Sequence, residues 1–114
     1  MSDILRELDE IVKRRKAERE EGSYTAYLYD EGLDKVLKKL GEETTETIIA
    51  AKNLDVCQNS GLDQDGSRKA LEGESGDLLY HLVVMLDMLG VEIDDVEELL
   101  RERMKKTKNL KQGR

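Results

Sequence analysis

The chain has 114 residues, enough for one domain, and it contains no proline, tryptophan or phenylalanine. Its formal net charge of −7 argues against general nucleic-acid binding and suits a site that attracts cations. Cys57 is the single cysteine, which excludes an intrachain disulfide and a cysteine-rich zinc site. No signal peptide is evident at the N-terminus and no apolar run reaches transmembrane length, so we expect a cytoplasmic protein.

Apolar residues recur at helical spacing along the chain, which predicts an all-α fold of four to five helices. The first helix is expected to follow Ser2, a suitable N-cap, with its apolar positions in residues 4–12. Gly22 interrupts the charged continuation of this helix. Ser23 can then cap a second, short helix over residues 24–29.

Gly32 separates the short helix from a longer one, which we expect over residues 33–53. Turn-forming residues are frequent over residues 53–67, so this stretch is expected to be a loop. The predicted helix has an apolar stripe expected to face the core, formed by Leu33, Val36, Leu37, Leu40, Thr44 and Ala51.

A fourth helix is expected over residues 67–89, and its segment 78–86 is apolar almost all round, as in a central helix. The last helix is expected to start at Asp94, which forms a capping-box pattern with Glu97. Its predicted buried residues are Val96, Leu99, Leu100 and Met104.

We expect residues 1–104 to form one all-α domain and residues 105–114 to form a basic, solvated tail. The core lacks large aromatic side chains, which limits the burial that each helix contributes. The segments 48–51 and 78–86 are more apolar than a surface helix requires. Together these features predict a core that is completed by association with a partner.

Two acidic clusters stand out, EETTE at residues 42–46 and ESGD at residues 74–77. Helical residues three apart lie about 60° apart around the axis, so each cluster presents a pair of acids on one side of its helix. Oxygen-only ligation suits magnesium or manganese rather than zinc. The alternative of solvent-exposed helix charges stays open. The four acids that can converge are Glu43, Glu46, Glu74 and Asp77.

The two acidic motifs are similar to the signature of the all-α nucleotide pyrophosphohydrolases, the MazG-like proteins. The strings SYTA at 23–26, GLDKVLKKLGEE at 32–43 and DLLYHL at 77–82 closely resemble the phosphoribosyl-ATP pyrophosphatase family. The likeness covers about residues 2–104. The chain departs from the family pattern in the apparently long loop between the acidic helices and in its basic tail.

The resemblance implies a MazG-like helical bundle that hydrolyses phosphoribosyl-ATP to phosphoribosyl-AMP and pyrophosphate, the second step of histidine biosynthesis. It implies a requirement for Mg²⁺, with Mn²⁺ as a substitute, and a homodimer. On this basis we assign metal coordination to Glu43, Glu46, Glu74 and Asp77. Glu42 is the candidate to orient or deprotonate the attacking water. The candidate contacts to substrate phosphates are Lys35, Lys38 and Lys39.

Some of these assignments have equally simple structural alternatives. Each lysine, and Glu42, can be an ordinary solvated helix residue. His81 falls on the same helix side as the second acidic pair, where a buried, hydrogen-bonded structural histidine is the preferred interpretation. Two other functions also remain open. One is a house-cleaning nucleoside triphosphate pyrophosphatase of the same fold, and the other is a non-enzymatic helical interaction module.

Overall fold

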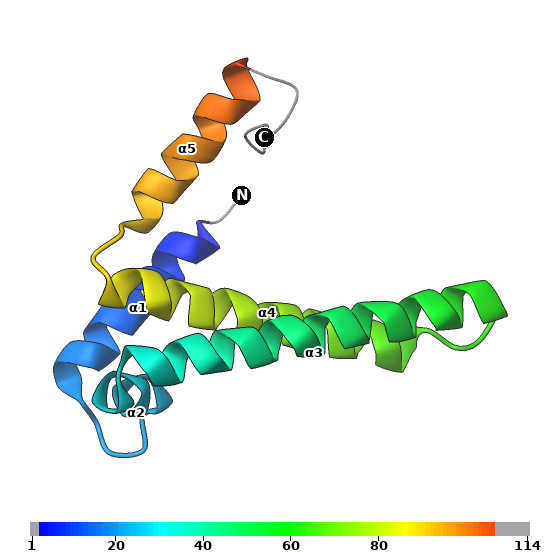
Figure 1. Cartoon of the computed structure of the whole chain (residues 1–114), viewed down its shortest axis with the longest axis horizontal. Coiled ribbons are helices and arrows are strands. Elements are labelled where there is room, and N and C mark those ends of the chain that lie inside the picture. The colour runs from blue at the N-terminus through cyan, green and yellow to red at the C-terminus, as the bar shows by residue number, and fades with distance from the viewer. Residues whose placement is uncertain (1–2, 107–114) are drawn as a thin grey trace.

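The computed structural model describes residues 3–106, which contain five helices and no strand. The predicted all-α class is therefore confirmed. Figure 1 shows a long antiparallel hairpin, with two helices packed at the end opposite its connecting turn and the last helix extending away. None of the described helices is long and apolar enough to cross a membrane. The helices are α1 (Ile4–Glu18), α2 (Tyr24–Glu31), α3 (Leu33–Ser60), α4 (Asp65–Met88) and α5 (Ile93–Lys106).

The first two helices have side-chain caps at their N-termini. Asp3 caps α1 by accepting a hydrogen bond from the Arg6 backbone at 3.4 Å, so the prediction of a Ser2 cap is wrong. Ser2 itself lies outside the described residues. Ser23 caps α2 as predicted, because its hydroxyl accepts from the Ala26 backbone at 3.2 Å.

Helix α3 is longer than the sequence predicted. It continues to Ser60, so the predicted loop over residues 53–67 is wrong, and only residues 61–64 connect it to α4. The connection is short because Gly61 adopts a φ of 68°, a left-handed conformation that ends the helix without a steric penalty. Near the turn, the Cys57 sulfur lies 3.4 Å from the Ser67 hydroxyl. The unusual loop inferred for this chain is therefore absent.

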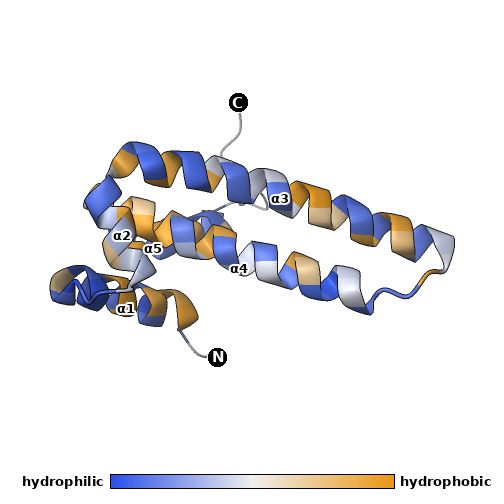
Figure 2. Cartoon of the chain, turned by 90° about the horizontal axis from the view of Figure 1, so that it is seen from below, coloured by the Kyte–Doolittle hydropathy of each residue, from blue (hydrophilic) through white to orange (hydrophobic). Residues whose placement is uncertain are grey.

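The core lies where the hairpin meets α1, α2 and the first residue of α5. Its buried members are Val12, Leu28, Val36, Val83, Val84 and Ile93. The predicted burial of the whole α3 stripe is wrong for the single chain, because Leu37 is 43 % exposed and both Thr44 and Ala51 are also exposed. Figure 2 shows apolar positions recurring along the hairpin well beyond this core.

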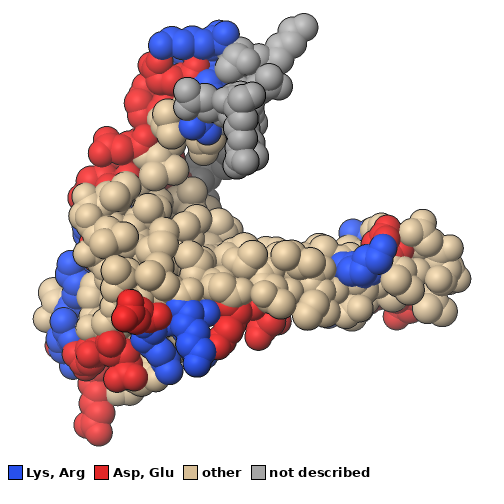
Figure 3. Space-filling view, viewed as in Figure 1, with Lys and Arg blue, Asp and Glu red and all other residues tan. Residues whose placement is uncertain are grey.

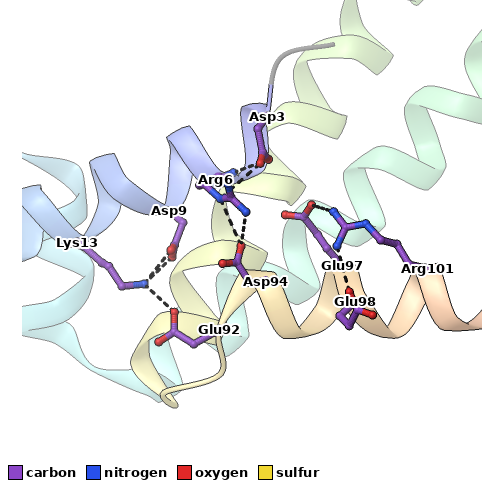
Figure 4. Close-up of polar contacts among 9 residues, drawn as sticks. All are labelled: Asp3, Arg6, Asp9, Lys13, Glu92, Asp94, Glu97, Glu98 and Arg101. Carbon is purple, nitrogen blue, oxygen red and sulfur yellow. Dashed lines mark hydrogen bonds and ion pairs between the residues drawn. The ribbon is translucent and has the colours of Figure 1, made fainter.

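Helix α5 makes few contacts with the rest of the chain. It begins at Ile93, so Asp94 lies in its first turn and the predicted capping box is wrong. Instead, the Asp94 carboxylate accepts from the Arg6 guanidinium at 3.1 Å (Figure 4). The helix ends at Lys106, and residues 107–114 of the predicted tail lie outside the described part of the chain. Three residues predicted to be buried are exposed on it: Leu99, Leu100 and Met104.

A buried carboxylate in α4 joins three helices. The Asp87 side chain is 5 % exposed and accepts hydrogen bonds from the Tyr29 hydroxyl and from the Lys16 ammonium at 3.1 Å. It also forms an ion pair with Lys13 at 3.1 Å. Burial alone would raise the pKa of Asp87, but the hydrogen bonds from Tyr29, Lys16 and Lys13 outweigh it and lower that pKa. No local sequence pattern indicates this cluster, because its members come from three helices.

Candidate active site

Three of the four predicted metal-binding acids converge midway along the hairpin. Helix α3 supplies Glu43 and Glu46 from consecutive turns, and α4 supplies Glu74. One carboxylate oxygen from each lies within 4.8 Å of the others. The Thr47 hydroxyl holds the helices together here, at 2.7 Å from the Glu43 carbonyl oxygen and 3.3 Å from the Glu74 carbonyl oxygen. We call these three acids the carboxylate cluster.

The negative charges of the carboxylate cluster repel one another and raise the pKa of two of its members. The pKa of Glu74 is raised to about 7, first by a hydrogen bond shared with the Glu46 carboxyl, then by burial and by the charges of Glu46 and Glu43. The pKa of Glu43 is also raised, first by burial and then by the charges of Glu46 and Asp77. The Oε2 atoms of Glu43 and Glu74 are buried and have no hydrogen-bond partner among the described residues.

These properties fit a hard divalent cation. The donors in the carboxylate cluster are all carboxylate oxygens, the ligands that Mg²⁺ and Mn²⁺ accept and that zinc rarely takes alone. Two buried oxygens without partners are groups that a cation would satisfy. A cation would also offset the mutual repulsion that raises the pKa of Glu74 and Glu43.

The remaining two predicted acids lie beside the carboxylate cluster rather than within it. Asp77 is exposed and is not one of the three acids whose oxygens converge, although its charge contributes to the raised pKa of Glu43. Glu42 is exposed, and its carboxylate lies 3.6 Å from the Lys39 ammonium in an ion pair. The roles assigned to Asp77 and Glu42 therefore stay predictions.

The three candidate phosphate-binding lysines occupy different sides of α3. At about 100° per residue, Lys35 and Lys39 fall within about 20° of Glu46 around the axis, whereas Lys38 falls about 80° away. The Lys35 ammonium lies 5.9 Å from the centre of the Tyr27 ring. Lys38 is exposed. The geometry favours Lys35 and Lys39 over Lys38 as groups that face a ligand of the carboxylate cluster.

A tyrosine and a histidine connect α2 to the part of α4 that carries the acids. The His81 Nδ1 atom lies 2.7 Å from the Asp77 carbonyl oxygen, which only accepts, so Nδ1 carries the proton. The Tyr24 hydroxyl, 2.9 Å from Nε2, therefore donates to the histidine. His81 is 4 % exposed, which confirms the structural interpretation. No role was predicted for Tyr24 from the sequence, although it follows the Ser23 cap in the string SYTA at 23–26.

A hollow of about 220 Å³ adjoins the carboxylate cluster on the side of the hairpin turn. Two of its lining residues, Glu46 and Glu74, belong to the carboxylate cluster. The hollow could not be predicted from the apolar residues of α3 alone, because its walls come from two segments that are distant in the sequence. The other lining residues are Ile49, Ala50, Asn53 and Ala70.

Comparisons with known proteins place these residues in a family. The profile of the phosphoribosyl-ATP pyrophosphohydrolase family matches residues 5–104. The chain is 47 % identical over 103 residues to a phosphoribosyl-ATP pyrophosphatase of Streptococcus sanguinis, covering 90 % of this chain and 88 % of that protein. It is 40 % identical over 113 residues to the Clostridium acetobutylicum protein of the same name, covering 99 % and 92 %. It also matches 42 % of the histidine biosynthesis bifunctional protein HisIE of Bacillus subtilis, at 45 % identity over 88 % of this chain.

Proposed function

Because this chain belongs to the phosphoribosyl-ATP pyrophosphohydrolase family, we propose that it hydrolyses phosphoribosyl-ATP to phosphoribosyl-AMP and pyrophosphate in histidine biosynthesis. The observation that carries the proposal is the carboxylate cluster, which lies within the matched residues 5–104. The curated relatives are named as hydrolases of this type, so the alternative of a non-enzymatic interaction module is set aside. We expect the reaction to take place in the cytoplasm.

The proposed cofactor is Mg²⁺, with Mn²⁺ as a substitute, held by Glu43, Glu46 and Glu74 and joined by Asp77. When bound, the ion neutralises charge on the phosphate oxygens and makes the α–β linkage easier to attack. Glu42 stands next to the carboxylate cluster on α3, where its carboxylate can orient or deprotonate the attacking water. Its ion pair with Lys39 restrains the carboxylate on this part of the helix.

Lysine side chains of α3 are proposed to bind the pyrophosphate that leaves. The pKa of Lys39 is raised, first by the charge of Glu42, so its ammonium group stays protonated at neutral pH. Lys35 lies one turn before it on the same side of the helix. Lys38 remains a weaker candidate, because it lies further around the helix from the carboxylate cluster.

The deciding experiment measures pyrophosphate release by the purified protein from phosphoribosyl-ATP and from a panel of dNTPs, with and without Mg²⁺. We expect Mg²⁺-dependent release from phosphoribosyl-ATP and little from the dNTPs. Comparable turnover of the dNTPs would instead favour a house-cleaning nucleotide pyrophosphatase of the same fold. Release that continues after chelation of divalent ions would contradict the metal proposal.

We also propose that two copies of the chain pair along an exposed side of α3. Leu37, Thr44, Ile48 and Ala51 follow one another at spacings of seven, four and three residues, the pattern of a coiled-coil seam. All four are exposed in the single chain, and Ile48 is 64 % exposed. Figure 3 shows a largely uncharged surface over the middle of the hairpin. A second copy packed along the seam would bury its four exposed side chains and so complete the core, as the sequence predicted.

Ile48→Asp is expected to shift the protein from dimer to monomer, because it would bury a carboxylate without a partner in the seam. Sedimentation equilibrium at several concentrations measures the change. Ile4→Asp is the matched control, because Ile4 is similarly exposed, at 63 %, but belongs to α1 and not to the proposed seam on α3. A monomeric wild type, or an Ile48→Asp protein with the wild-type mass, would contradict the proposed dimer.

A further inference from the structure

The surroundings of the carboxylate cluster differ between its two ends. Towards the start of α3, the charge of Glu43 contributes to the raised pKa of Lys39, and Lys35 lies one turn before Lys39 on the same side of the helix. Towards the hairpin turn lies the hollow of about 220 Å³, which is lined by no lysine or arginine of the described residues 3–106. Phosphoribosyl-ATP carries a triphosphate at one end and a single phosphate on its phosphoribosyl group at the other, so the lysines favour the orientation that brings the triphosphate end to the start of α3.

The hollow is suited to part of a nucleotide. Its walls include the aliphatic side chains of Ile49 and Ala70, and Asn53 adds an amide that can both donate and accept hydrogen bonds. Ligand pockets usually measure about 300–1,000 Å³, so a hollow of about 220 Å³ accommodates one portion of the substrate rather than all of it. Ile49 is 54 % exposed, which leaves apolar surface for a ligand to cover.

We propose that the hollow binds the purine nucleoside portion of the substrate, with the pyrophosphate end directed along α3 towards Lys39 and Lys35. This orientation rests on the proposed function. It assigns the nucleoside half of the substrate to the hollow and the pyrophosphate half to the two lysines. The hollow shares Glu46 and Glu74 with the carboxylate cluster, so a nucleoside in it would have its first phosphate beside the metal-binding oxygens. The reverse orientation would place the pyrophosphate end in the hollow, where none of the described lining residues is a lysine or arginine, and would leave Lys39 and Lys35 without a phosphate partner.

A second copy of the chain is a less suitable occupant of the hollow. Successive helical residues lie about 100° apart, so Ile49 at the hollow and Ile48 in the exposed seam face different directions. The seam has the regular spacing of a helix–helix contact. The hollow instead combines a small volume, an amide and two carboxylates, which suits a small polar ligand better than a second helix.

Ala70→Leu and Lys39→Ala test the orientation by separating the two ends of the ligand. NMR titrations in Mg²⁺ would measure the Kd of AMP, a probe for the nucleoside end, and of pyrophosphate. We expect Ala70→Leu to weaken AMP binding about 10-fold or more, because added methyl groups fill the hollow, and to leave pyrophosphate binding within about 2-fold. Lys39→Ala is expected to weaken pyrophosphate binding about 10-fold and to leave AMP binding within about 2-fold.

Ala17→Leu is the matched control, because Ala17 is exposed on α1 and does not line the hollow. It is expected to bind both ligands like the wild type. The orientation would be overturned if Ala70→Leu weakened pyrophosphate binding and Lys39→Ala weakened AMP binding. If Ala70→Leu left AMP binding unchanged but altered the oligomeric mass, a second copy of the chain would cover the hollow. That result would also overturn the proposed orientation. These binding measurements do not require catalytic turnover. The proposed orientation can therefore fail independently of the proposed hydrolysis of phosphoribosyl-ATP.

Discussion

Glu46→Gln and Glu74→Gln are each expected to lower kcat/KM for pyrophosphate release from phosphoribosyl-ATP by at least about 100-fold. Loss of a residue that only supports a metal ligand costs about 10- to 100-fold in affinity or activity, and these two carboxylates are proposed to be the ligands themselves. Glutamine preserves the shape of the side chain while removing its charge. Steady-state kinetics over a range of Mg²⁺ concentrations would measure the loss. Asp77→Asn tests the fourth predicted ligand in the same way.

Glu72→Gln is the matched control for the α4 position, because it makes the same chemical change on an exposed residue two positions from Glu74. We expect it to retain wild-type activity. Mn²⁺ binding followed by electron paramagnetic resonance should weaken in Glu46→Gln and Glu74→Gln and stay normal in Glu72→Gln. Normal turnover by both Glu46→Gln and Glu74→Gln would show that the carboxylate cluster does not perform the reaction.

The same carboxylate cluster predicts how pH affects the stability of the metal-free protein. The pKa of Glu74 is about 7 in the folded chain and 4.5 in its unperturbed state, so between these values the folded chain holds a proton that the unfolded chain has released. This contribution to the free energy of unfolding is therefore present below about pH 4.5 and is lost as the pH rises to about 7. Urea unfolding of the wild type and of Glu74→Gln should diverge over this range. Saturating Mg²⁺ should reduce the divergence.

Asp87→Asn is expected to lower the free energy of unfolding by about 3 kcal/mol, several times what an exposed ion pair contributes. The variant leaves Lys13 and Lys16 without their buried counter-charge, and it weakens the hydrogen bond that the Tyr29 hydroxyl donates. For a domain of this size such a loss lowers Tm by roughly 10 °C. Thermal unfolding followed by circular dichroism at pH 7 provides the measurement.

Asp55→Asn provides the comparison, because Asp55 forms an exposed ion pair with Lys52 at 3.1 Å and should contribute about 1 kcal/mol or less. The pH dependence adds a second criterion. Because the pKa of Asp87 is lowered from 3.8, its stabilisation is present above that pH and is lost as the pH falls through the lower, folded-state value. The difference between the wild type and Asp87→Asn should therefore shrink in acid. A difference that stays constant down to about pH 2 would show that Asp87 is not held as a carboxylate.

The sequence predicted the number and type of the helices well because their apolar periodicity is strong. It placed the end of α3 too early, since residues after Asn53 include several turn formers whose local preference is weak for a helix. Contacts between distant residues override that preference: Leu54 is only 9 % exposed and Cys57 contacts Ser67 of α4. The position of the helix end therefore depends on packing that no local pattern reveals.

The acids of the site could be predicted because a helix relates residues three apart in a fixed way. That rule identified Glu43 and Glu46 on one helix and Glu74 on the other, and the structure brings them together. The role of Asp87 could not be predicted in this way, because its partners come from α1 and α2. The hollow was missed for the same reason, since its walls combine α3 and α4.

The four-residue connection between α3 and α4 also bears on when the site forms during folding. A short loop has a small closure entropy, and a hairpin of neighbouring helices has a low contact order, so it can form early. All three converging carboxylates belong to this hairpin. On the ribosome, all three carboxylates would be available once α4 has emerged, before α5 leaves the exit tunnel. A divalent ion bound as proposed above would then hold the nascent hairpin closed while α1, α2 and α5 pack against it.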